Sequence, residues 1–233
     1  MSSEQAKLDL ERIVFIGRTY EEYVRMFGLK DEDMLNKRIL DCPGGACSFT
    51  ATANQKGFNV TACDIAYGYP ENDLLLKGIQ DIEHAAAGLK QAKEGFVWNV
   101  FKNVEELKET RLSALKRCVQ DMKQHPQHYV HAVLPNLPFA DESFDLILSA
   151  HFLFTYHEQL DYAFHLAVLK EFLRVTRREV RIFPFVNLNG ETYEHAEKLV
   201  QHIKELGHEV QEIQVPYEFQ KGANTMLVIK IMA

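Results

Sequence analysis

The chain has few of the residues that a disulfide-stabilised or membrane-spanning protein needs. Its 233 residues include four cysteines, and no two of them form a C-x-x-C pair. This spacing predicts neither a disulfide framework nor a zinc ribbon. No apolar run approaches the ~20 residues of a transmembrane helix, and the polar N-terminus has no signal-peptide pattern. We therefore expect a protein of the reducing cytoplasm with no membrane partner.

Positive charge is also scarce. Lys and Arg number 26 against 33 Asp and Glu, which gives a formal net charge of −7. Non-specific binding to DNA or RNA depends on cations that neutralise phosphates, so neither nucleic acid is an expected partner. We interpret the densest basic cluster as a complement to the dipole at a helix C-terminus; it comprises Arg174, Arg177, Arg178 and Arg181. Among the ten histidines we find no H-x-x-x-H pair and no histidine–aspartate cluster, so no metal site is predicted.

What the chain does contain is a pair of apolar runs that each end in an acidic residue. The first run ends at Asp41 and is followed by the turn Pro43, Gly44, Gly45; the second ends at Asp64. This pattern is typical of a βαβ unit with a nucleotide across its first turn, because glycines admit the ligand and the helix start offers free N–H groups. Asp64 stands where a carboxylate accepts ribose hydroxyls. The third glycine of the dinucleotide motif is missing, which disfavours NAD.

Two stretches carry a resemblance to a known family. The turn resembles the first motif of class I S-adenosylmethionine-dependent methyltransferases, an acidic residue followed by G-x-G-x-G. Asp41 then takes the acidic position and Gly45 the central glycine, while Pro43 and Cys47 replace the outer glycines. The stretch from Leu137 to Ser149, LPFADESFDLILS, resembles the segment of that family that leads into the fourth strand. The resemblance covers about residues 35–233, apart from an insertion described below.

The resemblance implies a fold, a cofactor and a set of binding residues. The fold is α/β, a Rossmann-like three-layer sandwich with a mostly parallel seven-stranded sheet and an antiparallel closing strand, in a single domain over residues 1–233. The cofactor is S-adenosylmethionine. Residues expected to bind it are Asp41, Pro43, Gly44, Gly45, Asp64, Ile65, Asn136, Leu137, Ser149, Arg18 and Tyr20. Of these, Asn136 replaces the acidic residue that many relatives direct at adenine, and Arg18 or Tyr20 would meet the methionine carboxylate.

The hydrophobic pattern predicts the elements of this fold. Lead-in helices are expected within residues 1–34, with an amphipathic pattern over 7–29. Strands are expected at 38–41, 59–64, 129–134, 144–150 and 179–185, with a closing antiparallel pair at 210–215 and 225–231. Helices are expected at about 48–56, around 163–173 and around 196–203.

An insertion at residues 68–128 departs from the simple fold. It carries two apolar stripes at helical spacing, with Phe96, Trp98 and Phe101 between them. The insertion follows the second strand, so both its ends emerge at the sheet edge where ligands bind in such folds. We expect it to cap the acceptor pocket. A homodimer contact through the same apolar faces stays open as an alternative.

The chemistry of methyl transfer requires no catalytic triad, and none is present. The reactive group belongs to the cofactor, and the protein mainly aligns the acceptor. The substrate side is expected after the fourth strand, where His151 and Tyr156 are the catalytic candidates. We favour a methyltransferase acting on a small molecule. A non-catalytic protein that binds S-adenosylmethionine or S-adenosylhomocysteine and an oxidoreductase remain alternatives.

Overall fold

A seven-stranded sheet forms the centre of the molecule. The computed structural model describes residues 14–232, so part of the predicted lead-in lies outside the described residues. The strands are β1 (Arg38–Asp41), β2 (Asn59–Asp64), β3 (Tyr129–His131), β4 (Phe144–Ala150), β5 (Thr176–Phe183), β6 (Glu209–Gln214) and β7 (Thr225–Lys230). Their order across the sheet is β3-β2-β1-β4-β5-β7-β6. Only β7 runs against its neighbours, which confirms the predicted fold class.

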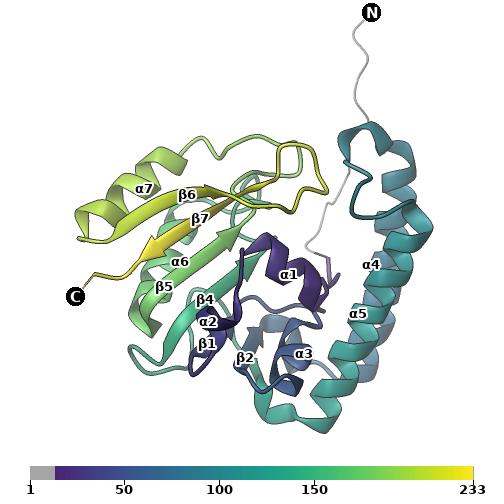
Figure 1. The fold of residues 1–233 in the computed structure, drawn as a ribbon, viewed down its shortest axis with the longest axis horizontal. Helices are drawn as coiled ribbons and strands as arrows, with labels where there is room; N and C mark the ends of the chain where they lie inside the picture. Colours follow the sequence, from purple (N-terminus) through teal and green to yellow (C-terminus); the bar gives the residue numbers. More distant parts are fainter. Residues whose placement is uncertain (1–13, 233) are drawn as a thin grey trace, which may run out of the picture.

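Helices cover both faces of the sheet (Figure 1). The helices α1 (Tyr20–Met26), α2 (Asp31–Met34) and α3 (Phe49–Gln55) share one apolar core with the sheet. The helices α6 (Tyr162–Val175) and α7 (Ala196–Glu205) share the other. Successive strand residues point to opposite faces, so Ile39 enters the first core and Leu40 the second. The result is the three-layer arrangement expected from the sequence.

The insertion consists of two long helices that lie side by side at one side of the molecule, next to α3 (Figure 1). These are α4 (Glu71–Gln91) and α5 (Val104–Gln124). Short 3-10 helices precede, join and follow them: η1 (Ile65–Gly68), η2 (Lys93–Gly95) and η3 (Pro126–His128). The two long helices approach closely at Gly78, where an added Cβ would lie 2.6 Å from Leu115 Cδ2. The prediction that both apolar stripes of the insertion are helical is confirmed.

The basic cluster differs from its prediction because β5 begins at Thr176, earlier than expected. Arg174 alone is in α6, and the other three arginines belong to the strand. Arg177 and Arg178 pair with Asp145, and the side chain of Arg181 donates to the Phe27 carbonyl at 2.8 Å. The helix-dipole interpretation is therefore wrong for these three.

Within residues 14–232, no helix is long and apolar enough to cross a membrane.

Candidate cofactor and acceptor site

The turn after β1 brings backbone N–H groups and an acidic side chain together. Gly45 has a φ of 52°, a left-handed conformation that favours glycine. Its N–H donates to Asp64 Oδ2 at 2.9 Å. Gly44 has no room for a side chain, because an added Cβ would lie 2.6 Å from Tyr67 Oη and 2.9 Å from Ala62 Cβ. The two glycines therefore allow a turn that a larger residue could not form.

Asp64 is fixed at the end of β2 by backbone donors. Its second oxygen, Oδ1, accepts from the Ala66 N–H at 2.8 Å. Burial raises the pKa of Asp64, and the N–H groups of Ala66 and Gly45 act against that rise. Each carboxylate oxygen has more than one acceptor position, so the side chain still has capacity for two ligand hydroxyls.

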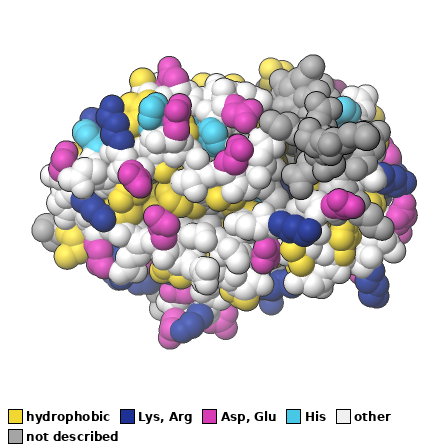
Figure 2. All heavy atoms as spheres, turned by 90° about the horizontal axis from the view of Figure 1, so that it is seen from above, with side chains coloured by type: hydrophobic (Ala, Val, Ile, Leu, Met, Phe, Trp, Pro, Cys, Tyr) yellow, Lys and Arg dark blue, Asp and Glu magenta, His cyan; other side chains and the backbone are white. Residues whose placement is uncertain are grey.

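A cavity of about 640 Å³ extends from Asp64 over the carboxyl ends of β1 and β2. Its wall is mainly apolar and includes Cys42, Cys63, Ile65, Ala132, Val133 and Leu137. An aromatic base fits such surroundings, because moving its apolar ring faces from water into an apolar cavity lowers the free energy. Figure 2 shows hydrophobic side chains gathered in a band across the face seen from above, with charged side chains around it.

A second cavity of about 180 Å³ lies on the other side of the glycine turn. Arg18, His151 and Tyr156 line it, together with residues of α4 and α5. The insertion contributes Ile82, Ala86, Leu89, Leu107, Lys108 and Arg111. The two cavities share five residues, namely Val14, Pro43, Gly45, Asp64 and Phe152. The two cavities are therefore neighbours at the glycine turn.

Arg18 supplies a cation at the second cavity. Its Nε is inaccessible to solvent and has no hydrogen-bond partner among the described residues. Burial lowers the pKa of Arg18, and the neighbouring Arg111 lowers it further. Because a guanidinium presents several donors in a fixed plane, this side chain is suited to an anionic group of a ligand.

His151 follows β4 in a left-handed conformation, with a φ of 51°. Its N–H donates to the Phe183 carbonyl at 2.6 Å, and its ring lies against the Phe183 ring at 5.5 Å. Ring atom Nδ1 is buried and has no hydrogen-bond partner among the described residues. Burial, followed by the charges of Arg18 and Arg111, lowers the pKa of His151 well below its ordinary value. The imidazole is therefore neutral at physiological pH.

A comparison with protein-family models finds one local similarity. The family model described as "Methyltransferase domain" matches residues 103–183, which include the end of the insertion, β3, β4 and most of β5. Over these residues the chain is similar to methyltransferase domains.

Similar proteins extend over nearly the whole length of the chain. An uncharacterized protein of Methanocaldococcus jannaschii is 37% identical over 224 residues, which cover 96% of this chain and 98% of that protein. Among solved structures, an S-adenosylmethionine-dependent methyltransferase of Aquifex aeolicus is 16% identical, with a TM-score of 0.41 over 91% of this chain and 89% of the other. A magnesium protoporphyrin IX methyltransferase of Synechocystis PCC 6803 with bound S-adenosylhomocysteine is 12% identical, with a TM-score of 0.45 over 87% and 77%.

The residues of the two cavities fit S-adenosylmethionine at both ends. Asp64 offers acceptors for ribose hydroxyls beside an apolar cavity suited to adenine. Arg18 offers an unpartnered buried nitrogen to the amino-acid carboxylate. The structure places most of the predicted site residues in these walls: Arg18, Pro43, Gly44, Gly45, Asp64, Ile65, Leu137, His151 and Tyr156.

Four predicted binding residues do not line either cavity: Asp41, Tyr20, Asn136 and Ser149. Asp41 is buried and accepts from the Tyr23 hydroxyl at 2.9 Å, and burial raises its pKa to about 8. Tyr20 stacks on Phe49 with a ring distance of 5.7 Å. These two contacts place both side chains in the supporting core.

The other two are excluded from the cavities by backbone geometry. Asn136 is exposed in a turn that pairs with Val133, and this turn ends β3 at His131 rather than at the predicted Leu134. Ser149 is fully buried on β4. Because strand side chains alternate, the cavity receives Ala150 instead.

A buried ion pair at the second cavity has no local sequence signal. Arg111 of α5 donates twice to Glu22 of α1, at 2.6 and 2.8 Å. The Tyr217 hydroxyl, from the β6–β7 connection, donates to the same carboxylate at 2.7 Å. Burial would raise the pKa of Glu22, but the Arg111 guanidinium holds it at about 2. These hydrogen bonds hold together three segments that are far apart in the chain: α1, α5 and the β6–β7 connection.

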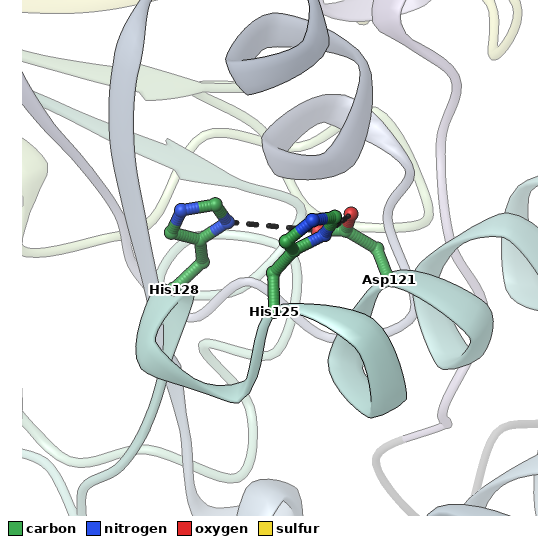
Figure 3. A group of neighbouring side chains, drawn as sticks. All are labelled: Asp121, His125 and His128. Atoms are coloured by element: carbon green, nitrogen blue, oxygen red, sulfur yellow. Dashed lines mark hydrogen bonds and ion pairs between the residues drawn. The ribbon is translucent and has the colours of Figure 1, made fainter.

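The prediction that no histidine–aspartate cluster exists is wrong. Asp121, His125 and His128 lie together at the end of α5 (Figure 3). Their D-x-x-x-H-x-x-H spacing was readable in the sequence, since helical residues four apart share a face. The cluster shares no residue with the walls of the two cavities.

Proposed function

We propose that the protein transfers a methyl group from S-adenosylmethionine to a small, partly apolar acceptor held between the glycine turn, His151 and the insertion. The observation that carries the proposal is the set of shared lining residues, which places the base-side and acceptor-side cavities next to each other at Gly45 and Asp64. The acceptor side is walled by apolar side chains of α4 and α5. This supports the role of the insertion as a cap that selects the acceptor by shape.

When bound, S-adenosylmethionine supplies a methyl group on a sulfonium, so the reaction is a single displacement. The contribution of the chain is alignment, which can supply on the order of 7–11 kcal/mol. Asp64 and Arg18 would fix the two ends of the cofactor. The hydrogen bonds among Glu22, Arg111 and Tyr217 would hold α5 of the cap to α1 and to the β6–β7 connection, and restrict the entry of water.

His151 is suited to orienting the acceptor as a neutral hydrogen-bond acceptor. Its Nδ1 has no partner among the described residues, and its lowered pKa makes it a weak base. Tyr156 is suited to donating, because burial raises the pKa of its phenol and keeps it protonated. An acceptor with an N–H or O–H group would contact both, which favours transfer to nitrogen or oxygen.

Two measurements test this proposal. Isothermal titration should show binding of S-adenosylmethionine and S-adenosylhomocysteine and no comparable binding of NAD. Turnover is then measured against a panel of small amines, phenols and carboxylates. His151→Ala should lower kcat while leaving the affinity for S-adenosylhomocysteine unchanged. Cofactor binding with no turnover across the panel, and no acceptor captured by the protein, would favour the non-catalytic alternative. A homodimer through the insertion remains a prediction.

A further inference from the structure

Three potential metal ligands converge at the C-terminal end of α5. Asp121 lies in the last turn of α5, His125 follows the helix as its C-cap, and His128 ends η3. One ligand atom from each lies within 4.8 Å of the other two. Figure 3 shows the His125 ring beside the Asp121 carboxylate and the His128 ring directed toward that carboxylate. We propose that Asp121, His125 and His128 bind a divalent transition-metal ion, and that this ion is zinc.

The donor set supports zinc over the alkaline-earth ions. Imidazole nitrogen suits zinc and its neighbours in the first transition series, whereas magnesium and calcium take oxygen ligands. Two histidines and one carboxylate leave a fourth tetrahedral position for water. The cluster borders a surface pocket of about 380 Å³ with polar side chains such as Gln120 and Gln124, so a water ligand has access.

The three side chains lie near one another without forming a closed site. His125 Nδ1 is hydrogen-bonded to Asp121 Oδ1 at 2.8 Å, and His128 Nδ1 lies 3.8 Å from the other oxygen, Asp121 Oδ2. Tetrahedral zinc with bonds near 2.0 Å places its ligand atoms about 3.3 Å apart. His125 is half exposed, at 49% of its side chain, so its ring can turn to close the site without disturbing the core.

His128 provides an independent observation. Its Nδ1 is inaccessible to solvent and has no hydrogen-bond partner among the described residues. A buried polar nitrogen without a partner is costly. The nearest oxygen of Asp121, at 3.8 Å, is too far away for a hydrogen bond. A metal ion between the two side chains would satisfy this nitrogen.

The surroundings orient the proposed ligands. The Tyr129 hydroxyl donates to Asp121 Oδ2 at 2.9 Å, which is the kind of outer contact that orients a ligating carboxylate. Arg117 lines the same surface pocket as the three proposed ligands, and its guanidinium donates a hydrogen bond to the Gln55 side chain. Tyr129 begins β3, which pairs with β2. A bound ion would therefore tie the end of the insertion to the edge of the sheet, away from the cofactor, and its role would be structural.

Zinc titration of the metal-stripped full-length protein tests the proposal. We expect one equivalent of Zn²⁺ to bind and to raise the melting temperature. Tyr129→Phe should weaken binding by about tenfold, the lower end of the effect of losing an outer-shell partner. His125→Ala and His128→Ala should weaken it more. His84→Ala, which removes an exposed histidine of α4, is the matched control and should bind as the unmodified protein does.

The possible outcomes separate this site from adventitious binding. Circular dichroism and S-adenosylhomocysteine affinity establish that each variant is folded. Substitution with Co²⁺ should give visible bands without thiolate charge transfer, which excludes the four buried cysteines as ligands. The proposal is overturned if one equivalent of Zn²⁺ fails to bind, or if His125→Ala and His128→Ala bind it as tightly as His84→Ala.

Discussion

Replacing Arg111 should measure how strongly the buried ion pair between Arg111 and Glu22 holds the insertion to the rest of the molecule. Arg111→Met keeps the length of the side chain but leaves the Glu22 carboxylate buried without its cation. The side chains of Arg111 and Glu22 are only 6% and 2% exposed. Breaking such a pair from one side costs about 3–5 kcal/mol, so we expect a loss of that size in the free energy of unfolding at pH 7.

The pH dependence gives a second measure of the same interaction. The pKa of Glu22 is about 2, against an ordinary value of 4.5, and this difference corresponds to about 3 kcal/mol. A carboxylate whose pKa is lower in the folded than in the unfolded protein stabilises the fold at pH values above the unfolded-state pKa. This contribution is lost as the pH falls through the folded-state pKa. The wild-type protein should therefore lose this stability between pH 4.5 and 2. In Arg111→Met, burial raises the pKa of Glu22, so the difference between the two proteins should narrow in acid.

Urea unfolding at pH 7 and at pH 3 measures both effects. Lys108→Met is the control, because Lys108 lies on the same helix and pairs with Glu83 at the surface, with 39% and 56% of the side chains exposed. An exposed pair of this kind contributes about 0–1 kcal/mol. Glu22→Gln combined with Arg111→Met should recover part of the loss. The reasoning is refuted if Arg111→Met and Lys108→Met destabilise the protein equally at pH 7.

Three further predictions concern the cofactor and the cap. Asp64→Asn should weaken S-adenosylhomocysteine binding by ten- to a hundredfold in calorimetry, since a charge-assisted hydrogen bond contributes roughly 1.5–3 kcal/mol. Gly44→Ala should lower stability by about 1–3 kcal/mol through overpacking against the Tyr67 hydroxyl and Ala62, as measured by urea unfolding. Trp98 fluorescence should change when an acceptor binds, because Trp98 packs edge-on against Phe219, which lines the acceptor cavity.

Each of these has an outcome that contradicts it. Unchanged affinity in a folded Asp64→Asn protein would show that the ribose lies elsewhere. Gly57→Ala is a poor control for Gly44 because its φ is 91°, whereas Gly95→Ala has open space for a Cβ. Equal stability of Gly44→Ala and Gly95→Ala would contradict the packing argument. Trp98 emission that does not respond to any acceptor that is turned over would contradict the role of the insertion as a cap.

The sequence predicted the elements where a local pattern determines structure. β1, β2 and β4 have the bounds expected from their apolar runs, because each run is buried and is followed by a turn or by a polar residue. The helices of the insertion followed from their periodicity alone. Asp64 and Gly45 could be placed in the site because the end of one strand and the first turn meet at the same edge of a parallel sheet.

Only the tertiary structure decided which side chains reach the cavity. The sequence predicts Asp41 as a cofactor ligand, yet its side chain turns into the core toward Tyr23, because neighbouring helices determine which face of a strand end is covered. Arg111 and Tyr217 lie 89 and 195 positions after Glu22 along the chain. No local sequence pattern encodes a pairing over such separations. It forms because α1, α5 and the β6–β7 connection are packed together around one cavity, where a buried charge is stable only beside its partner.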